Sequence, residues 1–295
     1  HLYCSGLCAS AASLFSSVLI QRVECPFVFI LGDLEEAGYF YHDLTQILGT
    51  EQVLFFPSSF RRAIKYGQKD AANEILRTEV LSRLQKGEEG LCVVTYPDAL
   101  AEKVVSRKEL GDKTLKLHLG EKVDMDFVTE VLRSYSFEYV DYVYEPGQYA
   151  VRGSIIDVFS FSSEFPFRID FFGDEVESIR TFEVESQLSK EKKENIVIVP
   201  DLSHSLEQRG NGGMVSFLDF LQPDTLLAMK DFLWLRERIQ TVHDEALTAQ
   251  AIAAREAEEN GLISLDGKLI DGGEFTLRAL DFRRIEFGTK PTETP

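Results

Sequence analysis

Residues Tyr149–Arg180 read YAVRGSIIDVFSFSSEFPFRIDFFGDEVESIR, a series of short β-rich segments separated by turn residues. In a strand over Phe167–Phe172, successive side chains point to opposite faces. One face then carries an apolar row of Phe167, Ile169 and Phe171. The other carries Arg168, Asp170 and Phe172, so a large aromatic side chain lies among charges on the face expected to contact water. With arginines from neighbouring strands beside it, Phe172 indicates a docking surface.

The segments around this strand predict an antiparallel α+β module that begins near Lys113. Lys113–Leu119 alternates between apolar and polar residues, and Asp126–Tyr135 has the pattern of a short amphipathic helix. Three strands are expected, over Tyr149–Phe159, Pro166–Phe172 and Glu175–Phe182. Gly173-Asp174 between the last two is typical of a two-residue hairpin turn.

The N-terminal third predicts a different architecture, in which buried strands alternate with helices. Strands are expected over Pro26–Leu31, Gln52–Phe56 and Gly90–Tyr96, and helices over Asp33–Leu48 and Ala71–Gln85. Continuous apolar runs separated by helices are typical of a parallel sheet covered on both faces. The same texture returns near the C-terminus, with strands at Ile196–Pro200 and Thr225–Met229, a helix over Asp231–Glu259 and a β-rich segment over Ile263–Phe287.

We therefore predict an α/β protein whose parallel-sheet core, a pseudo-helicase core, comes from two chain segments, with a small antiparallel α+β domain inserted between them. The predicted domains are residues 1–112 for the first part of the core, 113–190 for the inserted domain, and 191–295 for the second part and a C-terminal linker. The charged run Ser189–Asn195 (SKEKKEN) is expected to be a solvated connector between the last two.

Composition narrows the possible classes of protein. A chain of 295 residues exceeds the usual size of one core, and 44% hydrophobic with 27% charged residues is typical of a folded protein. The net charge of −18 argues against strong nucleic-acid binding, which draws on basic patches. No apolar run approaches the roughly 18–20 residues that span a bilayer, and no basic region precedes the first apolar stretch. We expect a cytoplasmic protein without a membrane partner.

Metal-ligand and catalytic patterns are missing from the sequence. The four cysteines (Cys4, Cys8, Cys25 and Cys92) are scattered, which favours structural thiols over a metal site. The five histidines form no ligand spacing, and no Gly-x-Ser-x-Gly elbow occurs. We therefore expect neither a metal nor a catalytic site.

Gly6–Ser13 (GLCASAAS) keeps the spacing of a phosphate-binding loop, which reads Gly, four residues, then Gly-Lys-Ser/Thr. Gly6 and Ser13 are present, but Ala11 and Ala12 replace the glycine and the lysine that would approach the phosphate. After Thr225–Met229, Asp231 is present where a hydrolytic NTPase has Asp-Glu, but Phe232 replaces the second acid. Together the two segments predict the architecture of a nucleotide-binding domain that lacks the residues needed to bind and hydrolyse a nucleotide. On pattern alone, Gly6–Ser13 also fits an ordinary helix start.

Tyr149–Phe159 and Phe167–Arg180 closely resemble the UvrB-homology module, and the match is best in the transcription-repair coupling factor family. The resemblance rests on a Val-Arg-Gly strand, an Arg-Ile-Asp-Phe-Phe-Gly-Asp-Glu hairpin and a Ser-Ile-Arg strand at the family's spacing. It extends more weakly through Ser5–Ala11 and Phe56–Ser58. Ala11 and Ala12 depart from the intact loop of UvrB, which favours the coupling factor.

In that family the middle domain recruits UvrA, the damage-recognition protein, and the matching contact positions here are Arg152, Arg168 and Phe172. Asp170, on the same face, is expected to orient an arginine. The resemblance implies an N-terminal fragment with no ATP hydrolysis, no cofactor and no strong DNA binding of its own.

ATP and magnesium would belong to the rest of the parent chain, with its RNA-polymerase-interacting, translocase and C-terminal domains. Two alternatives remain open, a divergent UvrB-like DNA-dependent ATPase or helicase and an autoinhibitory clamp on the parent.

Overall fold

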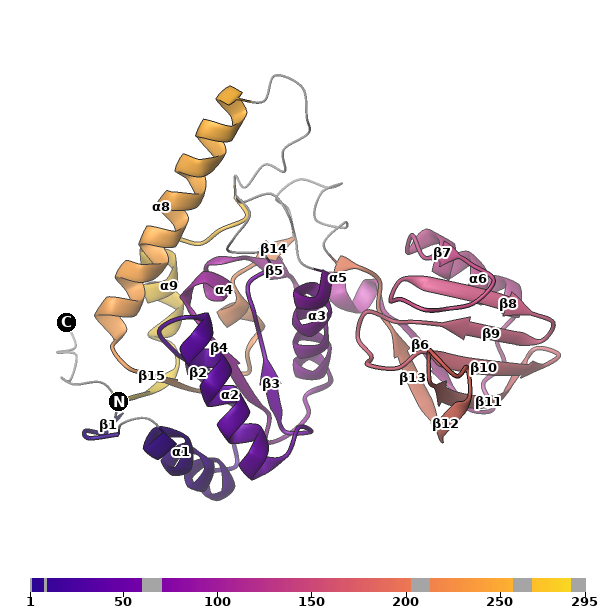
Figure 1. The fold of residues 1–295 in the computed structure, drawn as a ribbon, viewed down its shortest axis with the longest axis horizontal. Coiled ribbons are helices and arrows are strands. Elements are labelled where there is room, and N and C mark those ends of the chain that lie inside the picture. Colours follow the sequence, from indigo (N-terminus) through magenta and orange to yellow (C-terminus); the bar gives the residue numbers. More distant parts are fainter. Residues whose placement is uncertain (1, 8–9, 60–70, 203–212, 257–266, 288–295) are drawn as a thin grey trace. The chain divides into compact units, whose positions relative to one another are not determined.

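The computed structural model describes residues 2–7, 10–59, 71–202, 213–256 and 267–287, and Figure 1 shows its ribbon. The chain forms two compact units. Residues 1–106 and 209–295 make up unit 1, and residues 107–208 make up unit 2. Each unit has its own sheet, and the two are described separately.

Unit 1 is built around a six-stranded parallel sheet with the order β1-β16-β15-β2-β4-β3. Its strands are β1 (Leu2–Tyr3), β2 (Phe27–Ile30), β3 (Val53–Phe55), β4 (Cys92–Thr95), β15 (Leu226–Met229) and β16 (Arg283–Glu286). Every residue of β2, β4 and β15 is buried, as expected for strands covered on both faces. The prediction of a parallel sheet in a mixed α/β chain is confirmed, and both ends of the sequence contribute strands to it.

The helices of unit 1 cover this sheet. They are α1 (Ser10–Arg22), α2 (Leu34–Leu48), α3 (Ala71–Lys86), α4 (Pro97–Ala101), α8 (Phe232–Glu256), α9 (Gly272–Ala279) and the 3-10 turn η1 (Phe217–Phe220). Helix α1 packs against α2, whereas α8 packs against α4 and α9. A small ladder pairs β5 (Val104–Val105) with β14 (Met214–Val215). The predicted helices at Asp33–Leu48 and Ala71–Gln85 are confirmed.

Unit 2 contains a six-stranded sheet with the order β12-β11-β10-β9-β8-β7, antiparallel except for the β7–β8 pair. Its strands are β7 (Glu138–Tyr139), β8 (Gln148–Arg152), β9 (Ile155–Val158), β10 (Phe167–Phe172), β11 (Glu175–Phe182) and β12 (Ser189–Lys192). A second ladder pairs β6 (Leu115–His118) with β13 (Asn195–Ile198), and the helices are α5 (Arg107–Asp112) and α6 (Met125–Ser134). The predicted antiparallel sheet is confirmed, but the single strand expected over Tyr149–Phe159 is a hairpin of β8 and β9 that turns at Gly153, whose φ is +61°.

One face of this sheet forms the core of unit 2. The apolar row of β10 packs with Ile156 of β9 and with Val128 and Leu132 of α6 in a single buried cluster. Helix α6 therefore covers the core face. The opposite face carries the charged row of β10 and a smaller buried cluster of Val143, Ala150, Phe159 and Phe182.

Three other expectations were wrong. Ile196–Pro200 does not rejoin the parallel sheet, because β13 pairs antiparallel with β6. A short apolar run does not encode the direction of its partner. Ser189–Lys192 is solvent-exposed but forms the edge strand β12. The expected β-rich segment at the C-terminus contains helix α9, which begins after the N-cap Asp271, although residues 263–266 of that segment lie outside the described ranges.

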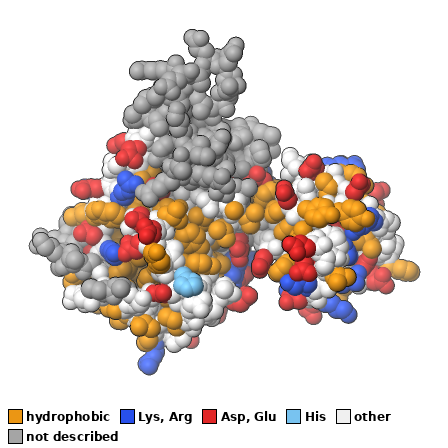
Figure 2. All heavy atoms as spheres, viewed as in Figure 1, with side chains coloured by type: hydrophobic (Ala, Val, Ile, Leu, Met, Phe, Trp, Pro, Cys, Tyr) orange, Lys and Arg blue, Asp and Glu red, His pale blue; other side chains and the backbone are white. Residues whose placement is uncertain are grey.

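Charged and hydrophobic side chains are interspersed over the surface that Figure 2 shows. Within the described ranges, no helix combines the length and the apolar character needed to cross a bilayer.

Candidate functional site

Phe172 is the most exposed of the large apolar side chains in the described residues, with 76% of its surface accessible. It is the last residue of β10 and pairs with Glu175 across the hairpin. Gly173 next to it has a φ of +64°, a conformation that glycine adopts without strain. The pairing register shifts between Asp170 and Phe171. The turn therefore holds Phe172 at the tip of the hairpin, on the face predicted from alternation.

Arg168 lies on the same face of β10, but its guanidinium is almost fully engaged inside the protein. Nε donates to Oδ1 of Asp157 at 2.7 Å and Nη2 donates to Oδ2 at 2.8 Å, a bidentate pair across neighbouring strands. Nη1 donates to the carbonyl of Gln187 at 3.1 Å, and the guanidinium lies 4.5 Å from the ring centroid of Phe182. Hydrogen bonding to Asp157 raises the pKa of Arg168 above its ordinary value.

Arg152 shares the same carboxylate. Its Nη2 donates to Oδ2 of Asp157, and its Nη1 donates to the carbonyl of Asp141 at 3.4 Å. The guanidinium lies over the ring of Tyr142, 5.2 Å from the centroid, within the range of cation–π contacts. Asp157 itself is buried, with only 1% of its surface accessible. One buried acid therefore orients both predicted arginines.

A closed set of contacts joins these residues. The side chain of Gln187 donates to the carbonyl of Val143 at 3.3 Å, while its backbone carbonyl accepts from Arg168. Val143 is buried in the small cluster on this face, so the segment carrying Tyr142 is fixed against the sheet. The ring of contacts runs through Arg152, Asp157, Arg168, Gln187 and the segment 141–143, and it holds the two arginines in one arrangement.

Asp170 orients an arginine, as expected, but that arginine is Arg180 rather than Arg152 or Arg168. Its Oδ2 accepts from Nη2 of Arg180 and from the hydroxyl of Ser178 at 3.0 Å. Asp157 forms ion pairs with both predicted arginines, and the sequence analysis did not identify it. Its signal was a lone acid between Ile156 and Val158 in an otherwise apolar strand.

Residues 115–204 match the family model described as the UvrB interaction domain. This range lies entirely within unit 2, which carries Arg152, Arg168 and Phe172. The chain resembles the N-terminal UvrB-homology module of the transcription-repair-coupling factors. That resemblance, predicted from the sequence, is confirmed by the family match and by curated relatives.

Three such relatives are named transcription-repair-coupling factors. The one from Bacillus subtilis is 30% identical over 197 residues, the one from Escherichia coli 29% over 196, and the one from Myxococcus xanthus 28% over 201. Each match covers 66% of this chain but 17% of the relative's length. The chain thus corresponds to a small part of those proteins. The assignment of individual residues in the UvrB interaction domain to a docking surface stays a prediction.

Outside the UvrB interaction domain, the residues predicted to form a degenerate nucleotide loop lie at or near the starts of α1 and α8. Residues 8–9 lie outside the described ranges; Gly6 has a φ of +80°, and α1 begins at Ser10 with Ala11 exposed and Ala12 buried. The hydroxyl of Ser13 is buried and donates to Oδ2 of Asp43 at 3.0 Å. Asp231 accepts from the backbone N–H of Trp234 at 2.9 Å in the first turn of α8. Their description as a decayed phosphate loop stays a prediction.

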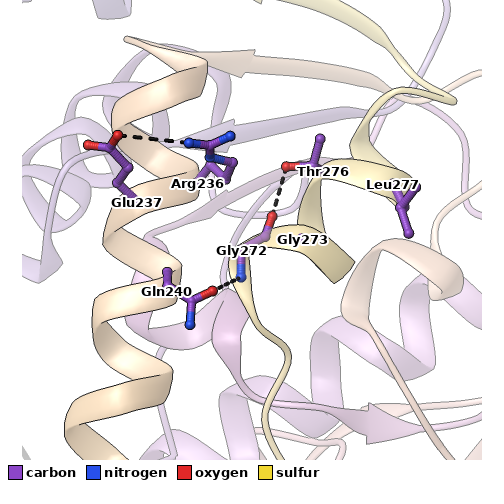
Figure 3. A pocket seen from close by; sticks show the side chains of 7 residues that line it. All are labelled: Arg236, Glu237, Gln240, Gly272, Gly273, Thr276 and Leu277. Atoms are coloured by element: carbon purple, nitrogen blue, oxygen red, sulfur yellow. Dashed lines mark hydrogen bonds and ion pairs between the residues drawn. The ribbon is translucent and has the colours of Figure 1, made fainter.

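A shallow pocket of about 480 Å³ lies between α8 and α9, and Figure 3 shows the residues that line it. They are Arg236, Glu237, Gln240, Gly272, Gly273, Thr276 and Leu277. Gln240 of α8 accepts from the backbone N–H of Gly272 at 3.1 Å and so joins the two helices, whereas Thr276 donates to the Gly272 carbonyl at 2.7 Å within α9. A Cβ at Gly272 would lie 2.7 Å from the Arg236 carbonyl, which explains the glycine. None of the predicted site residues lines this pocket.

Potential metal ligands are dispersed in the part of the chain that the structure describes. Within it, no group of three or more His, Cys, Asp or Glu side chains is arranged to hold a metal ion. Cys25 and Cys92 are buried free thiols, and burial raises the pKa of both. Both side chains lie in the core, where a raised pKa disfavours the thiolate form.

Proposed function

We propose that this chain recruits UvrA through the surface that carries Arg152, Arg168 and Phe172, as the UvrB-homology module of a transcription-repair coupling factor. The observation that supports it best is the 76% exposed Phe172 on the same face as an arginine pair fixed by a buried acid. Aromatic and arginine side chains dominate the energetics of protein interfaces.

The proposed surface is pre-organised, which favours binding. The guanidinium of Arg168 and the turn at Gly173 are held before a partner arrives, so little side-chain entropy is lost on association. Phe172 then buries its ring against the partner, and the more exposed Arg152 supplies directional hydrogen bonds. In the parent chain, this step would deliver the excision machinery to a lesion at a stalled RNA polymerase.

Binding of the purified chain to UvrA, measured by calorimetry or surface plasmon resonance, tests the proposal. Phe172→Ala should weaken binding at least tenfold, because an anchoring aromatic is lost from an otherwise unchanged surface. Phe127→Ala is the matched control, since Phe127 is 52% exposed on α6, the helix that covers the opposite face of the sheet. Equal affinities of the wild-type chain and Phe172→Ala would refute the assignment.

Arg168→Glu needs a stability measurement beside it. The change would set a second carboxylate against the buried Asp157, so loss of binding could reflect unfolding of unit 2. Arg152→Ala is the cleaner variant, because 37% of the Arg152 side chain is exposed and Arg168 continues to pair with Asp157.

We also propose that the chain hydrolyses no ATP and takes no cofactor. Alanines at 11 and 12 offer no cation to a phosphate, and Asp231 is engaged at the start of α8. ATP, magnesium and DNA would be handled by the other domains of the parent chain, in the cytoplasm. A DNA-stimulated ATPase assay on the purified chain tests this. Turnover that persists through purification and requires Ser13 would instead support the divergent ATPase.

A further inference from the structure

The two arginines of the docking surface differ in how much of their hydrogen-bonding capacity is free. Arg168 directs all three of its guanidinium nitrogens to acceptors within the protein, and its side chain is only 15% exposed. Arg152 makes one strong contact, with Asp157, and one long contact of 3.4 Å with the Asp141 carbonyl. A partner can therefore reach donors of Arg152 far more readily than donors of Arg168.

Tyr142 lies directly beside the accessible arginine. Its ring contacts the Arg152 guanidinium and is itself 53% exposed. Its position is fixed because the next residue, Val143, is buried in the cluster with Ala150 and Phe182. Arg152 and Tyr142 together present a cation and an aromatic ring to solvent, two strands away from Phe172 in the sheet.

We propose that Arg152 and Tyr142 form the polar contact of the docking surface and receive a carboxylate of the partner, while Arg168 and Asp157 are positioning residues. This inference rests on the proposed function and names the chemistry of the partner surface. It adds Tyr142 as a contact residue and assigns Arg168 an indirect role.

The charges around the site support a carboxylate as the group received. In the ion pairs of this face, three guanidinium groups share two carboxylates, Asp157 and Asp170, and Arg152 has the most exposed side chain of the three arginines. The turn beyond Phe172 carries the exposed acids Asp174 and Glu175, and the chain as a whole has a net charge of −18. A partner carboxylate is therefore attracted to Arg152 and repelled from the hairpin tip, which fixes the orientation of docking.

Affinity for UvrA, measured with single substitutions in the same chain, tests Tyr142. Tyr142→Leu should weaken binding about 5- to 30-fold, because the ring that contacts the guanidinium is removed. Tyr142→Phe keeps the ring and should change affinity less than about threefold. Tyr139→Leu is a matched control, since Tyr139 is exposed nearby but its ring contacts Tyr149 rather than Arg152.

A double-mutant cycle separates a shared contact from two independent ones. In an Arg152→Gln background, Tyr142→Leu should lose most of its effect, because the two side chains act as one contact.

The role of Arg168 is tested by stability as well as affinity. Arg168→Lys should lower both the midpoint of urea unfolding and the affinity, whereas Arg152→Lys should lower affinity with an unchanged midpoint.

The outcomes distinguish this inference from the proposed function. If Phe172→Ala abolishes UvrA binding while Tyr142→Leu binds as tightly as the wild type, the Tyr142 contact is overturned and recruitment stands. If the wild-type chain does not bind UvrA, the proposed function itself fails. If Arg168→Lys lowers affinity without any change in stability, Arg168 is a direct contact and its positioning role is overturned.

Discussion

Asp157 and Arg168 form a bidentate pair across neighbouring strands, with Nε–Oδ1 and Nη2–Oδ2 distances of 2.7 and 2.8 Å. Both side chains lie on the same face of the sheet, where the acid is buried and the arginine side chain is 15% exposed, so the pair fixes Arg168 on the face that also carries Phe172. The hydrogen bond to Asp157 raises the pKa of Arg168, which therefore keeps its charge throughout the physiological pH range. We expect the docking surface to show no pH dependence arising from this arginine.

Asp157→Asn should destabilise unit 2 by about 2–4 kcal/mol, because two guanidinium groups lose their shared charge and the new amide N–H₂ faces their donors. Urea unfolding followed by circular dichroism measures the change. Asp170→Asn is the matched control, since its pair with Arg180 is partly exposed and should cost at most about 1 kcal/mol. Equal losses in the two variants would contradict the central role of Asp157.

Truncation to alanine should affect the free energy of unfolding very differently at the two adjacent phenylalanines that end β10. Phe172→Ala should change the free energy of unfolding by no more than about 0.5 kcal/mol, because the ring is in solvent. Phe171→Ala should cost about 3–5 kcal/mol, because its ring is buried in the core beneath the sheet. Thermal unfolding of both variants gives the comparison, and a large loss for Phe172→Ala would mean that the ring packs inside the protein.

Gly173→Ala should destabilise the hairpin by about 1 kcal/mol. The φ of +64° is unfavourable for a side chain, although a Cβ there would meet no other atom within 4 Å. Gly173→Asn should cost less, since asparagine tolerates this region of φ. Denaturant unfolding measures both, and an alanine variant as stable as the wild type would show that the turn can adopt another conformation.

A buried acid in unit 1 has a structural role that the sequence did not reveal. Glu102 accepts from the hydroxyl groups of Ser58 and Ser59, from the backbone N–H of Ser59 at 3.0 Å, and lies 3.4 Å from Nη1 of Arg77. Glu102→Gln should cost about 2–4 kcal/mol in urea unfolding, because an amide cannot accept all of these bonds. An unchanged unfolding midpoint would show that water or another group replaces them.

Tyr96 should make unit 1 sensitive to alkali. Burial raises its pKa to about 12, and its hydroxyl oxygen accepts from the Ser58 N–H at 2.9 Å. Between pH 10, the ordinary pKa, and about 12, the folded state keeps a proton that the unfolded chain releases, so the free energy of unfolding falls.

Tyr96→Phe should be less stable than the wild type at pH 7 by about 1–2 kcal/mol, because Ser58 loses its acceptor. The difference should shrink as pH rises from 10 to 12, where only the wild type loses this contribution. Urea midpoints of both proteins across that range provide the measurement. A constant difference would show that Tyr96 titrates normally.

Local patterns were sufficient to predict the two sheets, the helices Asp33–Leu48 and Ala71–Gln85, and the exposure of Phe172. Alternation and continuous apolar runs report burial residue by residue, and the buried strands, the covering helices and the exposed ring each leave that signal. The same patterns could not give the direction in which β13 pairs, because four apolar residues fit either orientation. They also could not distinguish a solvated connector from the edge strand β12.

The amino-acid order established which side chains could form a docking face, through alternation in Phe167–Phe172 and a glycine at the turn. Only the tertiary structure decided which acid forms an ion pair with which arginine. Asp157 meets Arg168 across a strand pair, and Tyr142 reaches Arg152 because Val143 is buried on the same face. Such pairs of residues are determined by strand register and by packing between segments that are distant in the sequence. Both depend on which face of the complete sheet is buried, and no local sequence pattern contains that information.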